Sequence, residues 1–325
     1  MVTLAQPPNQ TPHAALQRKR LLTSLNFGLV YVFWGSTYLA ILIGVRHLPP
    51  ALLCGVRFPI SGAIMLAWCV MTGKTIRLSG RDALKLLLVG VLLMTTGNAV
   101  LAWSEQFIHS GLAAMIVAIV PIWVALIETV IGGDRLRGLG WTGLLLGFAG
   151  LFALLWPDLT SETTLGRRDL VVSLIVALAA LSWAAGSVCS HHFHVDVGLF
   201  AATGWEMLFA GIVNILIAAA HGDFQRADWS RSAWLAIGYL VVFGSLVGFT
   251  AYSWLLDHVP TPKVATYAYV NPVVAVFLGW IFLGEHLDRY MFLGMIVIIA
   301  AVALVTSSKL SSGSPPAATC DTGAD

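Results

Sequence analysis

Repeated apolar runs of about 20 residues limit most strongly what this chain can fold into. A helix needs about 20 apolar residues to cross the hydrocarbon core of a bilayer, where its backbone polar groups must bond within the segment. Turn-forming or charged residues separate these runs. The runs cover residues 25–45, 51–71, 83–103, 110–131, 139–156, 171–190, 199–219, 234–256, 264–283 and 290–307. The sequence therefore predicts an all-α polytopic membrane protein with ten transmembrane helices.

Composition excludes the main alternatives to a membrane protein. Hydrophobic residues make up 58% of the chain and charged residues 10%, whereas soluble domains carry roughly 25% charged residues. The lipid bilayer is thus an expected partner. A net charge of +2, without a basic run among aromatics, gives no reason to expect a nucleic-acid partner. The spacing of the four cysteines predicts neither a disulfide framework nor a zinc site.

The lysines and arginines predict the orientation of the chain. With a cytoplasmic N-terminus, eleven of the 18 lie in inner segments and six in outer loops, with Arg57 inside a span. We therefore expect both termini on the cytoplasmic side of the cell inner membrane. The end segments, 1–24 and 308–325, are polar and without periodicity, so we expect them to be disordered.

The chain contains an internal repeat of five spans. The first copy covers 25–156 and the second 171–307, joined by an extracytoplasmic loop at 157–170. Corresponding residues differ by 151 or, further upstream, by 149: Gly97 and Gly248, Trp103 and Trp254, Pro121 and Pro272, Trp34 and Trp183, Arg57 and Glu206. Because five is odd, the second copy enters the bilayer from the opposite side. Inverted repeats of this kind are typical of secondary transporters that work by alternating access.

Three segments resemble a known family. The first span contains Trp34-Gly35-Ser36-Thr37 within residues 32–41, and Pro49-Pro50 precedes residues 55–58 in the second. A third segment covers residues 265–285, from the ninth span through Asn271-Pro272 to the residues just after it. These segments are similar to EamA-type members of the drug/metabolite transporter superfamily, and the first is close to the YedA-like branch. The likeness covers roughly residues 25–307.

The resemblance implies a ten-helix fold of two inverted five-helix repeats around a central cavity. It also implies efflux of amino acids, drugs or other metabolites, with no cofactor. The neighbours of a small-molecule substrate would be aromatic and amide side chains. Within helices, Trp34 with Tyr38 and Tyr267 with Asn271 share one face each at i, i+4. The candidate substrate-binding residues are Trp34, Tyr38, Arg57, Asn98, Trp183, Tyr252, Tyr267 and Asn271.

Ionisable residues inside spans are functional candidates because each costs about 2.5–3.5 kcal/mol on insertion scales. Arg57 could bind a substrate carboxylate, meet Glu105 at the outer end of the third span, or join helices structurally. Glu206 could carry protons or make a helix–helix hydrogen bond. The repeat places Arg57 and Glu206 on opposite sides of the midplane, so we do not expect them to pair.

The other candidates for coupling or gating are Glu128, Pro121 and Pro272. For Glu128 we favour a structural ion pair with Arg135 or Arg137. Proline frees a carbonyl one turn earlier, which then needs a partner or lines a cavity. The histidines at 191, 192 and 194 favour a helix terminus over a metal site because they lack neighbouring ligands.

A small-molecule exporter, coupled to protons or not, is the function that these features favour. An uncoupled facilitator is the near alternative. An intramembrane enzyme is disfavoured because no HExxH, GxSxG or paired intramembrane aspartates are found, and we predict no catalytic residue. A scaffold would not need the pseudo-symmetry, and the spans contain no repeated acidic or carbonyl filter sequence of the kind that a channel uses. The sequence leaves a monomer and a homodimer both open.

Overall fold

A computed structural model describes residues 12–108, 113, 116–154, 167–283, 289–308 and 310–312. Six of its helical stretches are long and apolar enough to cross a membrane. They are Leu16–Val45, Pro50–Met71, Gly80–Ser104, Val171–His192, Leu199–Ala220 and Arg231–His258. These cover six of the ten predicted spans and show a multi-pass membrane protein.

The other four predicted spans fall on shorter helices: α6 (Val120–Ile131), α7 (Gly138–Leu154), α14 (Tyr267–Leu283) and α15 (Arg289–Ser307). Residues 109–112, 114 and 115 of the fourth predicted span lie outside the described residues. So does most of the predicted connecting loop, after which α9 (Arg167–His192) begins.

Capping residues and glycines set several helix ends. Helix α2 (Pro50–Met71) begins with a proline, whose missing N–H is not needed in the first turn. Helix α3 (Gly80–Gly90) begins after Ser79, whose hydroxyl accepts a hydrogen bond from the backbone N–H of Asp82. Helix α6 ends at Gly132, whose φ of 77° is left-handed.

The predicted disorder at the two ends is wrong where the structure describes them. Helix α1 (Pro12–Val45) begins well before residue 25, because residues 12–24 are rich in the helix formers Ala, Leu, Arg and Lys. In the tail, β2 (Leu310–Ser312) pairs antiparallel with β1 (Asp134–Leu136). The tail strand is therefore held by backbone hydrogen bonds to the loop after α6.

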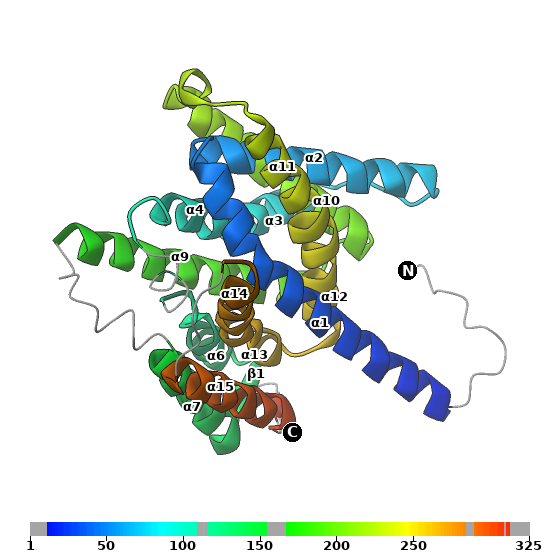
Figure 1. Ribbon diagram of the computed structural model, residues 1–325. Coiled ribbons are helices and arrows are strands. Elements are labelled where there is room, and N and C mark those ends of the chain that lie inside the picture. The colour runs from blue at the N-terminus through cyan, green and yellow to red at the C-terminus, as the bar shows by residue number, and fades with distance from the viewer. Residues whose placement is uncertain are drawn as a thin grey trace, which may run out of the picture.

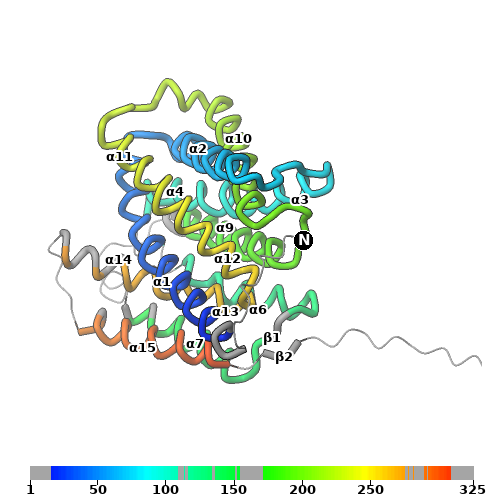
Figure 2. Tube along the Cα trace, turned by 90° about the vertical axis from the view of Figure 1, so that its right-hand side faces the viewer, coloured from blue at the N-terminus to red at the C-terminus, as the bar shows by residue number. Residues whose placement is uncertain are grey.

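Two helix pairs flank the centre of the bundle (Figures 1 and 2). One pair is α2 with α10 (Leu199–Ala220), and the other is α7 with α15. Helix α1 crosses between them and packs along α14. The start of α1 and the end of α15 lie on one side of the bundle, which we call the termini face. The opposite side is the far face.

Close approach in both pairs depends on glycine. A Cβ atom on Gly62 of α2 would lie 2.6 Å from the carbonyl oxygen of Gly204 in α10. A Cβ on Gly143 of α7 would lie 2.8 Å from the side chain of Val305 in α15. Small residues therefore let these helices meet closely.

Two π-helical segments occupy corresponding places in the two halves. The first, η1 (Val91–Ala99), continues from α3 and leads into α4 (Val100–Ser104). The second, η3 (Leu240–Phe249), lies between α11 (Arg231–Tyr239) and α12 (Thr250–His258). Both segments face the centre of the bundle, and π-helical turns often occur at functional sites.

Candidate functional site

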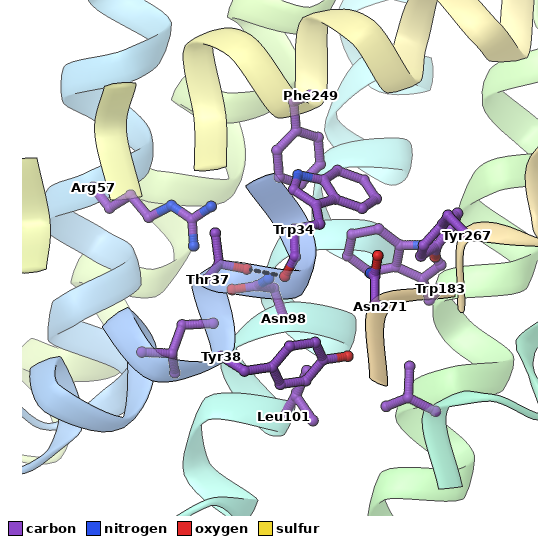
Figure 3. Close-up of a pocket in the computed structure, with 12 residues that line it drawn as sticks. Trp34, Thr37, Tyr38, Arg57, Asn98, Leu101, Trp183, Phe249, Tyr267 and Asn271 are labelled. Carbon is purple, nitrogen blue, oxygen red and sulfur yellow. Dashed lines mark hydrogen bonds between the residues drawn. The ribbon is translucent and has the colours of Figure 1, made fainter. Parts of the chain in front are cut away.

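A cavity of about 60 Å³ lies at the centre of the bundle, between helices of both halves (Figure 3). Its walls come from α1, α2, η1, α4, α9, η3 and α14, and from residue 117. The lining residues are Trp34, Thr37, Tyr38, Ile41, Arg57, Asn98, Leu101, Val117, Trp183, Phe249, Tyr267 and Asn271. Seven of the eight predicted substrate-binding residues therefore meet around one cavity.

The eighth, Tyr252 of α12, lies behind this wall. Its ring centroid is 4.7 Å from that of Trp34, and its hydroxyl is 2.5 Å from Oγ of Ser187 in α9. The ring of Tyr267 lies 5.5 Å away. Tyr252 thus supports the aromatic lining without itself lining the cavity.

Trp34 is the centre of an aromatic cluster. Its ring lies 5.5 Å from that of Trp183, 5.0 Å from Phe249 and 5.1 Å from Tyr267, mostly edge to face. Edge-to-face pairs at such distances are favourable beyond the area they bury. The cluster joins α1 and α9, one from each half, to η3 and α14.

The two tryptophans that the repeat predicts to correspond make exchanged contacts. Trp34 of the first half packs on Gly248 of the second, where a Cβ would lie 2.4 Å from the indole Nε1. Trp183 of the second half packs on Gly97 of the first, where a Cβ would lie 2.8 Å from its Cε3. Both glycines lie in the π-helical segments.

The two indoles differ in their hydrogen bonding. Nε1 of Trp34 donates to the carbonyl of Gly244 at 3.0 Å. Nε1 of Trp183 is buried and has no acceptor in the described part of the chain. The cavity wall is therefore fixed on the η3 side and has an open donor on the other.

Arg57 is 2% exposed and reaches the cavity from α2. Its Nε donates to Oγ of Ser245 at 2.9 Å, and the guanidinium carbon lies 4.8 Å from the ring centre of Phe58. Because a guanidinium has five N–H donors, Ser245 satisfies only part of it. The remaining donors can bind a planar acid.

Of the roles considered for Arg57, contact with Glu105 is not found. In the described residues Arg57 makes no ion pair, and both carboxyl oxygens of Glu105 are buried without a hydrogen-bond partner. Glu105 directly follows the last residue of α4, whereas Ser245, which accepts from Arg57, lies in η3. No ion pair between Arg57 and Glu206 is found among the described residues; Arg57 lines the central cavity and Glu206 a different pocket.

Amides and a tyrosine complete the polar lining. Tyr38 lies one turn after Trp34 on α1, and Asn98 accepts a weak hydrogen bond from the thiol of Cys54 at 3.7 Å. The amide oxygen of Asn271 is buried and has no partner among the described residues. An unpartnered buried acceptor is costly unless water or a ligand reaches it.

Glu206 faces a second space on the termini face. This pocket, of about 240 Å³, is lined by Glu206 with Ser190, Ser253 and Asp257 among others. Glu206 is 4% exposed. Tyr252 directly precedes Ser253 of this pocket in the chain, and its ring packs against Trp34 of the central cavity.

Glu128 contacts a histidine, and Arg137, one of its two expected partners, does not pair with it. Glu128 is fully buried and lies 3.0 Å from Nε2 of His192 at the end of α9. Arg137 is exposed and makes no ion pair in the described part of the chain, so that option is wrong; the side chain of Arg135 lies outside it. The contact with His192 forms because α6 and α9 pack together.

Pro121 and Pro272, the two candidate gating prolines, occupy different positions in their helices. Pro272 lies inside α14, as expected. Pro121 lies in the first turn of α6, after a turn at residues 118 and 119, so it begins a helix and does not interrupt one. Among described residues no group of three metal-ligating side chains forms, and His191 bonds the carbonyl of Leu256.

Sequence reasoning missed the η3 contribution. Gly244, Ser245 and Phe249 contact Trp34 and Arg57, yet an apolar run gives no sign of a π-helical turn. Gly248 was identified from the sequence only as the partner of Gly97 in the repeat, and this pairing was the one sequence signal that pointed to η3.

Comparisons with known proteins agree on a family. The EamA-like transporter family matches residues 23–156 and again residues 170–307. The inner membrane transporter YedA of Escherichia coli is 37% identical over 281 residues, covering 86% of this chain and 89% of its own. The transporter YoaV of Bacillus subtilis is 23% identical over 278 residues, covering 85% and 94%.

A solved structure shows the same fold. A protein crystal structure with 20% sequence identity superposes with a TM-score of 0.72, covering 87% of this chain and 97% of its own.

Proposed function

The chain belongs to the EamA-like transporter family, and from this premise we propose that it exports small amphipathic solutes across the inner membrane by alternating access. The proposed architecture has ten transmembrane helices as two inverted five-helix repeats, with both termini cytoplasmic. Amino acids, drugs and related metabolites are the proposed substrates. An uncoupled facilitator is the second candidate, because nothing in the cavity requires an ion.

One observation carries this proposal: the central cavity is built by both halves of the repeat. Trp34 and Trp183 correspond in the two halves and meet at 5.5 Å beside the cavity. A site at the interface of the halves can open to either side when one half moves against the other.

The lining supports amphipathic substrates. Aromatic rings provide apolar contact, while Arg57 and Asn271 offer a donor set and an open acceptor. A solute with a carboxylate, a hydrogen-bond donor and an apolar body matches these groups. At about 60 Å³ the cavity must widen to admit it, which is what alternating access requires.

Glu206 is the proposed proton carrier. It lies in a pocket on the termini face, away from Arg57, and no hydrogen bond to its carboxyl is found in the described residues. Intramembrane carboxylates of this kind are typical of proton relays.

Flux into proteoliposomes tests the proposal. Purified protein would be supplied with pooled amino acids, nucleosides and cationic dyes, with and without a pH gradient. We expect saturable uptake that Trp34→Ala abolishes and that Trp229→Ala, at an exposed tryptophan, leaves unchanged. Loss of the pH response in Glu206→Gln would support proton coupling, and a wild type indifferent to pH would support the facilitator. No saturable flux of any pool would contradict transport and favour a scaffold or an enzyme.

A further inference from the structure

A groove of about 700 Å³ lies on the far face, apart from the central cavity, and no residue lines both. It is bounded by the connection from α1 to α2, by η1 and α4, and by the end of α10 with η2 (Asp223–Arg226). Figure 1 shows these elements meeting where α1 turns into α2. We call it the far-face groove. Its volume is within the range of small-molecule sites.

The mouth of the far-face groove is rich in basic side chains. Arg46, His47, His221 and Arg226 line it, against one carboxylate, Asp223. Arg226 is paired with Asp223, and His47 lies 2.7 Å from the carboxylate of Asp228.

Arg46 differs from these paired groups. It is exposed and makes no ion pair in the described part of the chain. A guanidinium without a carboxylate, beside one that is already paired, is suited to an organic acid.

The deep end of the groove offers an acceptor. Asn214 is fully buried, and its amide nitrogen donates to Oγ1 of Thr95 at 3.2 Å and to the carbonyl of Ala210 at 2.9 Å. These two bonds use the donors of the amide, and its oxygen has no partner among the described residues. A ligand that reaches Asn214 must therefore bring a hydrogen-bond donor.

The wall between mouth and deep end is mainly apolar. Val100, Trp103 and Phe107 line one side and Ile217 the other, and the rings of Trp103 and Phe107 lie 4.8 Å apart. From Asn214 to His221 the groove follows two turns of α10, about 10 Å at 1.5 Å per residue.

We propose that the far-face groove binds an amphipathic organic anion, with its carboxylate at Arg46, its apolar body on Trp103 and a hydrogen-bond donor at Asn214. A phospholipid also has an anionic group for Arg46. It would, however, bring an acyl chain to Asn214 and leave the amide oxygen unmatched. The chemistry of the deep end thus favours a solute over a lipid.

Binding of dansylglycine tests the contacts proposed for Arg46 and Trp103, because it has a carboxylate and an aromatic body. Protein in phosphatidylcholine nanodiscs would be titrated while energy transfer from tryptophan is recorded, with empty nanodiscs subtracted. We expect saturable binding that Arg46→Gln weakens about tenfold or more, since charge-assisted hydrogen bonds have that effect. Dansylglycinamide, which lacks the charge, should bind more weakly and be indifferent to Arg46→Gln.

Matched variants separate the groove from its surroundings. Ile217→Phe fills the groove and should also weaken binding, whereas Leu216→Phe, at the neighbouring lipid-facing position, should not. Arg231→Gln removes another exposed arginine outside the lining and should leave binding unchanged. Equal melting temperatures would show that the variants fold.

Two results would overturn the proposal. One is no saturable binding above empty nanodiscs, or binding that neither Arg46→Gln nor Ile217→Phe alters. The other is a phospholipid that copurifies in native mass spectrometry, is lost in Arg46→Gln and is not displaced by dansylglycine. Either outcome is independent of whether the central cavity transports solutes.

Discussion

The indole N–H of Trp34 donates a 3.0 Å hydrogen bond to the backbone carbonyl of Gly244. The bond ties α1 of the first half to η3 of the second, across the wall of the central cavity. The corresponding indole, that of Trp183, has no acceptor among the described residues. The pseudo-symmetric contacts are therefore alike in packing but not in hydrogen bonding.

This asymmetry predicts different effects for the same substitution. Trp34→Phe should lower stability by about 1–3 kcal/mol beyond the loss of ring area, because the buried Gly244 carbonyl loses its partner. Trp183→Phe removes an N–H that has no partner and should cost less. Thermal unfolding of both variants in detergent measures the difference. Equal losses would contradict an energetic role for the Trp34 bond.

Glycine at 248 should be required by Trp34. A Cβ would lie 2.4 Å from Nε1 of Trp34, a distance at which something must shift. Gly248→Ala should therefore destabilise the protein by about 1–3 kcal/mol and reduce flux, because overpacking displaces side chains. Gly238→Ala, where nothing lies within 4 Å of the added atom, is the control and should be neutral or stabilising. An unchanged melting temperature in Gly248→Ala would show that the wall of the central cavity accommodates the added methyl group without loss of stability.

The sequence was sufficient for six of the spans and for the position of most of the cavity residues, for different reasons. Long apolar runs are a direct consequence of the bilayer, so six of them match helices closely. The i, i+4 spacing predicted Trp34 and Tyr267, and the repeat predicted Trp183. Both signals depend on helix periodicity and pseudo-symmetry, which position residues independently of how side chains pack.

Partners that depend on side-chain packing could not be predicted. Arg57 bonds Ser245 because η3 brings that hydroxyl close, and π-helical geometry has no mark in an apolar run. Glu128 meets His192 because α6 packs on α9, a contact that hydropathy does not specify. The helical start at Pro12 was missed because polarity was taken for disorder.

Arg57 should have separable effects on binding and on stability. Arg57→Lys keeps the charge but loses the planar fork, so the KM for carboxylate solutes should rise about tenfold or more. Ser245→Ala leaves the guanidinium in place and removes its 2.9 Å bond, so it should mainly lower stability, by about 1–3 kcal/mol. Proteoliposome kinetics and thermal unfolding measure the two effects. A KM unchanged by Arg57→Lys for every transported solute would leave Arg57 only a structural role.

Glu105, the first residue after the Gly80–Ser104 span, should make stability depend on pH. Burial raises the pKa of its carboxyl to about 8, against about 4.3 in an unfolded chain. Between these values the folded protein keeps a proton that the unfolded chain loses. Stability should therefore fall as the pH rises from about 4.3 to about 8 and level off above.

Glu105→Gln isolates this contribution, because glutamine is neutral throughout and has nearly the same shape. Its melting temperature relative to wild type should rise steadily between pH 5 and pH 8, the working range of most detergents. Gln106→Glu puts a carboxyl one residue later, at an exposed position, and should not change the pH dependence. If the difference in melting temperature between Glu105→Gln and wild type is instead the same at every pH, the Glu105 carboxyl does not hold its proton to pH 8. Water that enters from the far face must then hydrogen-bond the buried carboxylate.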